Sequence, residues 1–509
     1  MKNISLVVLT ALLLAGCSNH ENGRYIITDF GAVAGENSLN TIAINKAINT
    51  CNESGGGTVV IPPGTFYSGT IVLKSNVELF LEHGAVLMGS GNLADYDTIN
   101  AVGGLVYANN TRNIAISGTG SINGNGTHFH IPGKMHIAGD LQRKYIRQGE
   151  RYLREGATFT DGPIAYENRP GMMIVIMNSE NVKISNINLI DSPEWTFRIG
   201  DCDNVIFKGI SILNNLLIPN NDGIHCTNSR NVVISDCDIR AGDDAIIVTG
   251  FSSEINVHGE AEEKTMAQRY GNKTGYAENI TVTNCDLQSR SSGIRVGYGE
   301  HPIRNLVFSN LVIYDSNRGI GVFARDTASI ENVLFSNIII RNRLHSGHWW
   351  GNGEPIHVSS ITKNEGKQAG QVRNIRFSNI IANSETGILL WGEQPNSLQN
   401  IEFDRVQLHI RNSPLAKDYG GNFDLRPTAD LRYAIFKHDI PGFFVRNADN
   451  LKIKDFSLSW DSNVADYHSW GFEAENVKNL YIDPLSHFPA APGSGKKDIS
   501  LTNVTKAGM

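Results

Sequence analysis

The sequence predicts an all-β fold, a single parallel β-helix in which short strands wind into a solenoid, with an N-terminal capping helix. Three observations support this prediction. A short motif recurs at near-constant spacing, its residues alternate between apolar and polar, and no helical segment separates successive units. Without helices there is no βαβ crossover, so consecutive strands become parallel neighbours only if the chain coils.

The recurring motif is an Asn followed by an apolar residue and a short alternating strand, as in RNLVFSNLVI and ENVLFSNIII. It begins at Asn181, Asn204, Asn231, Asn279, Asn305, Asn332, Asn374 and Asn400. Several neighbouring motifs lie 23, 27, 26, 27 and 26 residues apart, which is typical of a solenoid, and the larger gaps leave room for loops. Asn side chains at equivalent turns are expected to stack, each amide bonding the next, which is a structural role.

The two ends of a coil expose unpaired strand edges and need covers. Residues 41–51 place Ile44, Ala47, Ile48 and Cys51 on one helical face, so this helix is expected to cap the N-terminal end of a β-helix that spans residues 25–505. Residues 139–156 are rich in charge and predict a helical excursion. It forms either a wall or lid over one face or a plain solvated helix.

The first seventeen residues read as a secretion signal, with one Lys, a short apolar run and a small-residue stop. Their end, Leu14-Ala15-Gly16-Cys17, resembles the lipobox of bacterial lipoproteins, in which the Cys is acylated. We therefore expect export across the inner membrane and lipidation at Cys17. The expected location is the outer membrane, as a lipoprotein facing the periplasm or the cell surface, with lipid chains as its contact with the membrane.

Composition narrows the classes of partner. The 509-residue chain has a net charge of −7 with scattered basic residues, so nucleic acid is not an expected partner. The cysteines after Cys17 are Cys51, Cys202, Cys226, Cys237 and Cys285. Their spacing is not that of a zinc site. We therefore expect these cysteines to be small, buried, apolar residues. We expect a monomer with no cofactor and no metal.

Three carboxylates stand at a spacing that matches one coil. The stretch NNDGIHCTNSRNVVISDCDIRAGDD places Asp222 22 residues before Asp244, with Asp243 beside it. On adjacent coils, equivalent residues are about 4.8 Å apart along the axis, so these side chains are expected to share one groove. Adjacent strand residues point to opposite sides, and Gly242 could allow the bend that brings both Asp243 and Asp244 to solvent.

A pair of carboxylates suits glycoside hydrolysis, because one protonated acid serves the leaving oxygen and one ionised partner activates water. Inverting enzymes hold the two groups roughly 6.5–9.5 Å apart to fit the water. The alternative is structural: an Asp ladder that caps turns, or a calcium site. Spacing alone leaves both readings open.

Further motifs carry a resemblance to a known family. SPEW at 192–195, NND at 220–222 and GDD at 242–244, in this order within the coils, resemble the polygalacturonase-type glycoside hydrolases, family 28. NGNG at 123–126 is similar to that group as well, and the resemblance covers roughly residues 28–410.

The resemblance implies a right-handed coil, an inverting mechanism and a pectic or related polysaccharide as substrate. It implies that Asp243 is the general acid and that Asp222 and Asp244 activate water.

The chain also departs from the family pattern. Ser291-Ser292-Gly293 stands where polygalacturonases have Gly-His-Gly, and Gly321-Val322-Phe323 stands where they have Arg-Ile-Lys. The missing Arg and Lys bind the substrate carboxylate, for which an Arg fork is the natural partner. Plain homogalacturonan is therefore not the expected substrate. Arg295 is the first candidate for a replacement charge, ahead of Arg318 and Arg325, although such residues are often structural.

A Gly-rich loop at 345–358 adds candidate sugar contacts. Exposed aromatic rings stack on sugar faces, and we expect one of Trp349 and Trp350 to do so while the other plugs a coil end. Trp391 would extend the same face if it points outward. The candidate substrate-binding residues are Asn220, Arg295, Trp349, Trp350 and Glu354.

Two rival functions remain open at this point. A polysaccharide lyase on the same fold would use an Arg or Lys base, and Arg295 beside the carboxylates could mimic that site. A noncatalytic glycan-binding lipoprotein would have lost the His, Arg and Lys by decay. Retention of all three Asp argues against the second rival.

Overall fold

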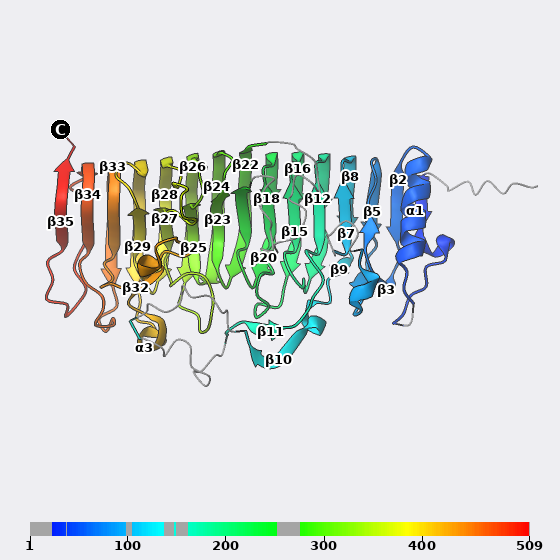
Figure 1. Cartoon of the computed structure of the whole chain (residues 1–509), viewed down its shortest axis with the longest axis horizontal. Helices are drawn as coiled ribbons and strands as arrows, with labels where there is room; N and C mark the ends of the chain where they lie inside the picture. The colour runs from blue at the N-terminus through cyan, green and yellow to red at the C-terminus, as the bar shows by residue number, and fades with distance from the viewer. Residues whose placement is uncertain are drawn as a thin grey trace, which may run out of the picture.

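The computed structural model describes residues 23–36, 38–97, 104–136, 147–148, 161–251 and 275–507. The chain coils into one long solenoid whose strands stand side by side from end to end (Figure 1). Neighbouring strands of its 31-stranded sheet are parallel at each pairing, for example Ile224 with Ile246 and Ile294 with Ile320. The predicted right-handed parallel β-helix is confirmed.

The strands fall into three stretches. The N-terminal coils contain β1 (Arg24–Ile26), β2 (Gly57–Ile61), β3 (Gly64–Ser68), β4 (Ile71–Val72), β5 (Val77–Leu81), β6 (Ala85–Gly89), β7 (Val106–Asn109), β8 (Arg112–Gly118) and β9 (Ser121–Asn123). The middle coils contain β12 (Ile174–Met177), β13 (Glu180–Ser185), β14 (Asn188–Ile190), β15 (Phe197–Gly200), β16 (Asp203–Lys208), β17 (Ser211–Leu213), β18 (Ile224–Thr227), β19 (Arg230–Ser235), β20 (Asp238–Ala241) and β21 (Ile246–Gly250). The C-terminal coils contain β22 (Ala277–Ser289), β23 (Ser292–Gly299), β24 (Ile303–Ser316), β25 (Arg318–Ala324), β26 (Ile330–Asn342), β27 (Ile356–Ser360), β28 (Val372–Ser384), β29 (Ile388–Gly392), β30 (Leu398–Ile410), β33 (Phe443–Trp460), β34 (Phe472–Ile482) and β35 (Ile499–Lys506).

A helix covers the N-terminal end of the solenoid, as predicted. It is α1 (Thr41–Glu53), which stands across the first coils in Figure 1. Its apolar face, Ile44, Ala47, Ile48 and Cys51, is buried against the first strands. The cap therefore hides the strand edge that an open coil would expose.

The core is a column of apolar side chains that repeats from coil to coil. Phe308, Phe335, Phe377 and Phe403 occupy equivalent positions, and their stacked rings lie 5.0, 5.0 and 4.8 Å apart. Stacking of this kind fixes the register, because a one-residue slip would turn every ring out of the core.

The Asn ladder forms at the turns as predicted, with one exception. Asn305 donates to Asn279, and Asn332 donates to Asn305, at 3.4 and 3.2 Å. These residues have positive φ angles, which Asn tolerates better than most side chains. Asn231 instead donates to the carboxylate of Asp203 at 2.7 Å, because a charged acceptor makes the stronger bond.

The five described cysteines, Cys51, Cys202, Cys226, Cys237 and Cys285, are free and buried, which confirms the prediction of small core residues. Cys17 and the signal segment lie outside the described residues, as does the predicted helix at 139–156 apart from residues 147–148. Among the described residues, no helix is long and apolar enough to cross a membrane.

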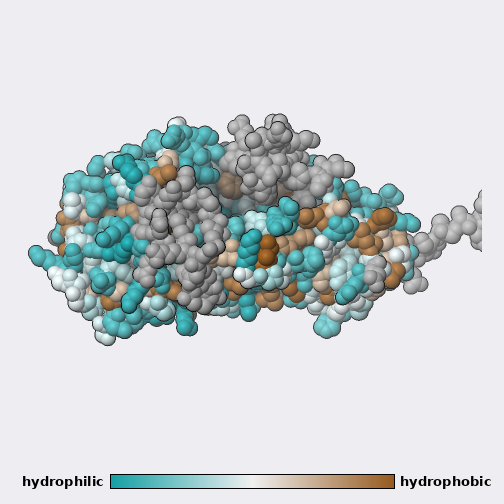
Figure 2. All heavy atoms as spheres, turned by 60° about the horizontal axis from the view of Figure 1, so that its bottom comes forward, coloured by the Kyte–Doolittle hydropathy of each residue, from teal (hydrophilic) through white to brown (hydrophobic). Residues whose placement is uncertain are grey.

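In the part of the chain that the structure describes, two insertions project from one side of the solenoid, below the strands in Figure 1. The first is the antiparallel pair β10 (His130–Met135) and β11 (Ile164–Tyr166). The second joins the helix α3 (Ala416–Tyr419) to the antiparallel pair β31 (Asn422–Asp424) and β32 (Ile435–Lys437). Short 3-10 turns complete the described structure: η2 (Ile27–Phe30), η3 (Leu93–Asp95), η4 (Gly126–Phe129) and η7 (Leu431–Tyr433). Figure 2 shows that the described surface on this side is largely hydrophilic, with small separate hydrophobic areas.

Candidate active site

The three predicted carboxylates line one pocket of about 310 Å³. Asp222 precedes β18, and Asp243 and Asp244 precede β21 on the next coil. The backbone N–H of Gly223 donates to the backbone oxygen of Asp244 at 2.9 Å, and Ile224 pairs with Ile246. Asp222 and Asp244 therefore occupy equivalent places on adjacent coils, as their 22-residue offset predicts.

A sharp turn at Gly242 lets Asp243 and Asp244 face the same pocket. A Cβ at this position would lie 2.3 Å from the backbone oxygen of Ile218, so only glycine fits. The Gly242 N–H donates to the side chain of Asn221, which fixes the turn. Past the turn, the Asp244 N–H donates to Oδ1 of Asp243 at 3.0 Å. Close packing, rather than a special φ angle, is the reason for the glycine.

Crowding and burial shift the acidity of two of the carboxyl groups. Burial and the neighbouring Asp244 together raise the pKa of Asp243 to about 7, although Arg295 opposes the shift. Burial also raises the pKa of Asp222 well above its ordinary value, and Asp243 and Asp244 add to that effect. Charged forms are disfavoured where several carboxylates share a poorly hydrated site, so the Asp222–Asp243 pair retains a proton near neutral pH.

Arg295 lies against Asp244, one coil beyond it. Its Nε donates to Oδ2 of Asp244, and its Nη1 donates to the backbone oxygen of Gly297 at 3.2 Å. The backbone N–H of Ser292 donates to the other carboxylate oxygen of Asp244 at 2.8 Å. Both oxygens of Asp244 therefore have fixed donors, and the guanidinium is held in the wall of the pocket.

Asp222 lies beside a neutral imidazole. Nδ1 of His225 is 3.7 Å from Oδ2 of Asp222, and the Trp195 ring lies over His225 with centroids 4.0 Å apart. Burial lowers the pKa of His225 well below its ordinary value, and Arg295 and Arg198 lower it further. His225 therefore stays uncharged and offers Asp222 no ion pair.

Asn220, a predicted substrate contact, also lines the pocket. Its Nδ2 lies 3.5 Å from Oδ2 of Asp243, and its Oδ1 accepts a hydrogen bond from Nη2 of Arg169 at 3.1 Å. Arg169 also donates to the backbone oxygens of Pro193 and Pro219. Arg169 fixes Asn220 so that its amide N–H points at the carboxyl of Asp243.

The departures from the family pattern fit each other. Phe323 lines the pocket, and a Cβ at Gly321 would lie 2.5 Å from its ring. Gly321 therefore makes room for Phe323, so the two substitutions depend on one another. Arg318 lies over the same ring at 4.9 Å and pairs with Oε2 of Glu354 at 3.5 Å.

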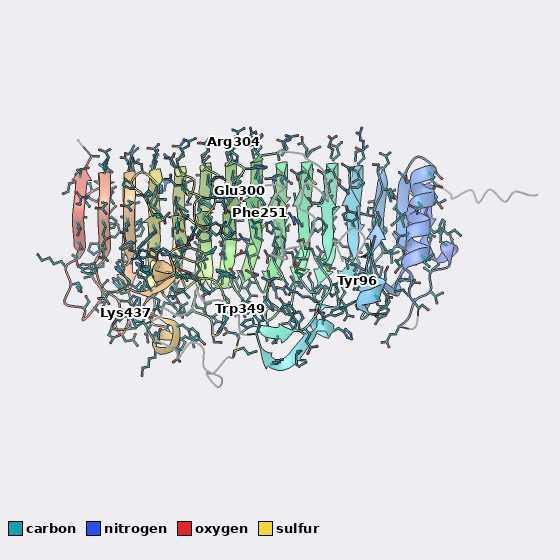
Figure 3. The ribbon with its side chains drawn as sticks, in the orientation of Figure 1. Tyr96, Phe251, Glu300, Arg304, Trp349 and Lys437 are labelled. Atoms are coloured by element: carbon teal, nitrogen blue, oxygen red, sulfur yellow. The ribbon has the colours of Figure 1, made fainter. Side chains whose placement is uncertain are left out.

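The two tryptophans of the Gly-rich loop have different environments. Trp350 lines the pocket, and the Arg426 guanidinium packs against its ring at 4.7 Å. Trp349 is only 3% exposed and donates from Nε1 to the backbone oxygen of Asp161 at 2.8 Å. Figure 3 shows Trp349 on the side of the solenoid where the insertions gather. The structure does not bring Trp349 into the pocket: its ring is buried against the segment that contains Asp161, on the side of the solenoid.

Two other expected sugar contacts lie away from the pocket. Glu354 is buried and holds Arg318 through Oε2, which also accepts from the backbone N–H of Asn352 at 2.7 Å. Trp391 does point outward from its coil, but Phe423 and Phe436 cover it. Glu354 therefore orients Arg318, and Trp391 does not extend the pocket.

Sequence reasoning missed three residues of the pocket lining, which are Tyr298, Lys363 and Pro427. Tyr298 lies under Arg295 at 4.8 Å and under Lys363 at 5.7 Å. Tyr298 stands three residues after Arg295 in SGIRVGYG, and this position could have indicated that it lines the pocket. Lys363 and Pro427 lie in loops without a motif, so nothing in their surrounding residues pointed to the site.

The solenoid and its clustered acids define a β-helical protein with a glycosidase-type site. The sequence profile of the glycosyl hydrolases family 28 matches residues 51–410, and the chain belongs to that family.

Individual relatives are more distant. The chain is 27% identical over 334 residues to the exo-poly-alpha-D-galacturonosidase of Dickeya chrysanthemi, covering 56% of this chain and 55% of that protein. It is 30% identical over 271 residues to a probable polygalacturonase of Vitis vinifera, covering 49% of each. The match thus spans about half the length of these two relatives. The family 28 exopolygalacturonase structure of Yersinia enterocolitica superposes with a TM-score of 0.61 at 20% identity, covering 96% of this chain and 78% of that one, which shows the common fold.

Proposed function

We propose that the protein is a glycoside hydrolase that cleaves a pectic or related polysaccharide by an inverting acid/base mechanism. The observation that carries this proposal is the pocket itself. Asp243 is buried there with a pKa near 7 beside two further carboxyl groups. Such an arrangement keeps one group protonated while a partner is ionised, which is what the reaction needs.

In the proposed reaction Asp243 donates its proton to the oxygen of the leaving sugar. Asp222 and Asp244 are the proposed bases, of which an ionised carboxylate accepts a proton from the attacking water. Arg295 holds Asp244 in place through Nε, and Asn220 orients the Asp243 carboxyl. The new C–O bond forms on the face opposite the departing oxygen, so the anomeric configuration inverts.

The substrate proposal follows from the charged groups in the wall. Relatives of this chain are named polygalacturonases, which supports a pectic substrate. At the positions where the family pattern has Arg and Lys, this chain has Gly321 and Phe323, while Arg295 and Arg318 are each paired with an acid. A branched or mixed acidic polysaccharide fits this wall better than plain homogalacturonan does. Rapid release of galacturonic acid from unesterified homogalacturonan would contradict the substrate part alone.

If the protein were a polysaccharide lyase with Arg295 as its base, Arg295 would have to lose a proton. Burial works to lower the pKa of Arg295, but Asp244, Tyr298 and the other two acids outweigh it, so the pKa is raised. A guanidinium held this way does not act as a base. A noncatalytic glycan binder has no need for an acid poised near neutral pH.

The test is a panel of pectic and other polysaccharides incubated with purified protein and separated by chromatography. Hydrolysis is expected to give saturated products. An unsaturated sugar that absorbs in the ultraviolet would identify a lyase instead, and binding without any product would favour the noncatalytic reading.

We also propose that the protein is a lipoprotein of the outer membrane, acylated at Cys17. The support is the sequence Leu14-Ala15-Gly16-Cys17 after a short apolar run. Metabolic labelling with a fatty acid is expected to mark the native chain and not Cys17→Ser. Equal labelling of both would contradict the lipid anchor.

A further inference from the structure

The pocket lies on the coils that contain β18, β21, β23 and β25. Successive coils place Asp222, Asp244, Ser292, Arg318 and Glu354 at equivalent positions along one face. The first four line or border the pocket, whereas Glu354 is not among the residues that line it. Along this row of equivalent positions, the pocket lining therefore ends between β25 and β27.

Beyond that point, several outward-pointing side chains are apolar and covered. Leu389 and Trp391 of β29 and Phe444 of β33 point away from the core, yet they are only 1%, 5% and 1% exposed. Their partners in the solenoid core, such as Leu390 and Val445, face the other way. A second hydrophobic cluster thus lies on the outer surface of the coils.

The cover is the hairpin of β31 and β32, residues 422–437, which we call the end wall. Phe423 packs on Phe444 with centroids 5.0 Å apart, and Phe436 packs on Trp391 at 5.5 Å. In Figure 1 β32 lies over β29, on the C-terminal side of β23 and β25. Figure 3 shows Lys437 of this hairpin on the same side of the solenoid as Trp349.

Polar contacts anchor the end wall to the pocket. Arg426 makes two 2.8 Å hydrogen bonds to Asp424 and a third, at 3.0 Å, to the backbone oxygen of Trp349. Asp424 in turn accepts from the backbone N–H of Gly351 at 2.8 Å. Burial alone would raise the pKa of Asp424, but Arg426 and Arg318 hold it below its ordinary value. Buried paired charges of this kind fix a single geometry.

Two residues connect the end wall to the pocket. Pro427 of the end wall and Trp350, whose ring is backed by Arg426, both line it. The resulting space of about 310 Å³ is at the small end of ligand sites in proteins. A polysaccharide cannot continue toward the C-terminal coils, because Leu389, Trp391 and Phe444 are already covered there.

We propose that this enzyme works from chain ends: the end wall stops the polysaccharide, so the terminal sugar residues fill the pocket and a short product of fixed length is released. This inference rests on the proposed hydrolase function. It makes the hairpin at 422–437 the determinant of exo action.

The test follows products over time with the wild-type protein and the best substrate from the panel. An end-acting enzyme is expected to release one short product from the first minutes, with little loss of viscosity per bond cleaved. At equal mass, a polymer shortened tenfold beforehand offers ten times as many ends and should be cleaved about tenfold faster. Early intermediate lengths with a steep fall in viscosity would overturn the inference while leaving the hydrolase intact. Absence of any hydrolysis would refute the proposed function instead.

A double variant tests whether the end wall determines the length of the product. Trp350→Ala with Pro427→Ala enlarges the closed end, so its first products should include longer fragments than those of the wild type. Lys417→Ala in α3, outside the pocket, is the matched control and should keep the single product. Thermal unfolding within a few degrees of the wild type would show that both variants fold. An unchanged single product from the folded double variant would remove the wall from this role.

Discussion

Replacing Asp243 by Asn tests the acid directly. The substitution keeps the shape of the side chain, and its Oδ1 can still accept from the Asp244 N–H, as it does at 3.0 Å in the native site. What it removes is the proton that burial and the neighbouring Asp244 keep on Asp243. Substrate binding should therefore change little while turnover falls.

The size of the effect follows from the usual contribution of a positioned general acid to the rate. General acid catalysis contributes about 10²–10⁴-fold, so kcat should fall by that factor, about 3–5 kcal/mol in the barrier. The pH dependence gives a second magnitude. With the pKa of Asp243 at about 7, the group is almost fully protonated at pH 5, and only about a tenth is protonated at pH 8. The wild-type rate should therefore drop about tenfold on the alkaline side.

The assay compares substrates with good and poor leaving groups across pH. A good leaving group needs less protonation, so Asp243→Asn should harm it less, and the alkaline fall should flatten. Asp236→Asn is a matched control, because Asp236 only accepts a ladder bond from Asn284. Equal loss on both substrates would remove Asp243 from the acid role, and near-normal turnover on the polymer would remove it from the mechanism.

Three further predictions concern Arg295, Gly242 and the Asn ladder. Arg295 lowers the pKa of Asp243, so Arg295→Gln should move the alkaline limb of kcat/KM to higher pH; a limb that stays or moves down would contradict this electrostatic role. Gly242→Ala should cut kcat at least tenfold, since its methyl would clash with the Ile218 oxygen and displace Asp243; unchanged kinetics would show that the turn tolerates a side chain. Asn305→Ala should lower the free energy of unfolding by about 1–3 kcal/mol in denaturant titration, because it loses ladder bonds and strains a φ of 58°, and Asn305→Gly should lose less. If Asn305→Ala and Asn305→Gly lost equal free energy of unfolding, the lost hydrogen bonds alone would account for the effect.

The shared pocket of Asp222, Asp243 and Asp244 could be predicted from sequence for a simple reason. In a solenoid one coil converts a separation along the chain into one strand spacing, so a 22-residue offset becomes contact. The Asn repeat and the apolar face of α1 were readable on the same grounds, since each depends on local periodicity.

The roles of Trp349 and Trp350 could not be separated in this way. Trp349 is buried because its indole N–H reaches the backbone of Asp161, 188 residues earlier. Trp350 is fixed by Arg426, from a hairpin beyond the matched family region, which ends at residue 410. Contacts between insertions follow no period, so neither pairing has a signature in the sequence.

The most direct test of the central claim is hydrolysis in ¹⁸O-labelled water with NMR of the first product. The pair of acids in the pocket predicts that one labelled oxygen enters at the new reducing end and that the product first appears with the anomeric configuration opposite to that of the cleaved bond. Retained configuration would contradict the inverting arrangement of Asp222, Asp243 and Asp244. An unsaturated product without label would contradict hydrolysis itself.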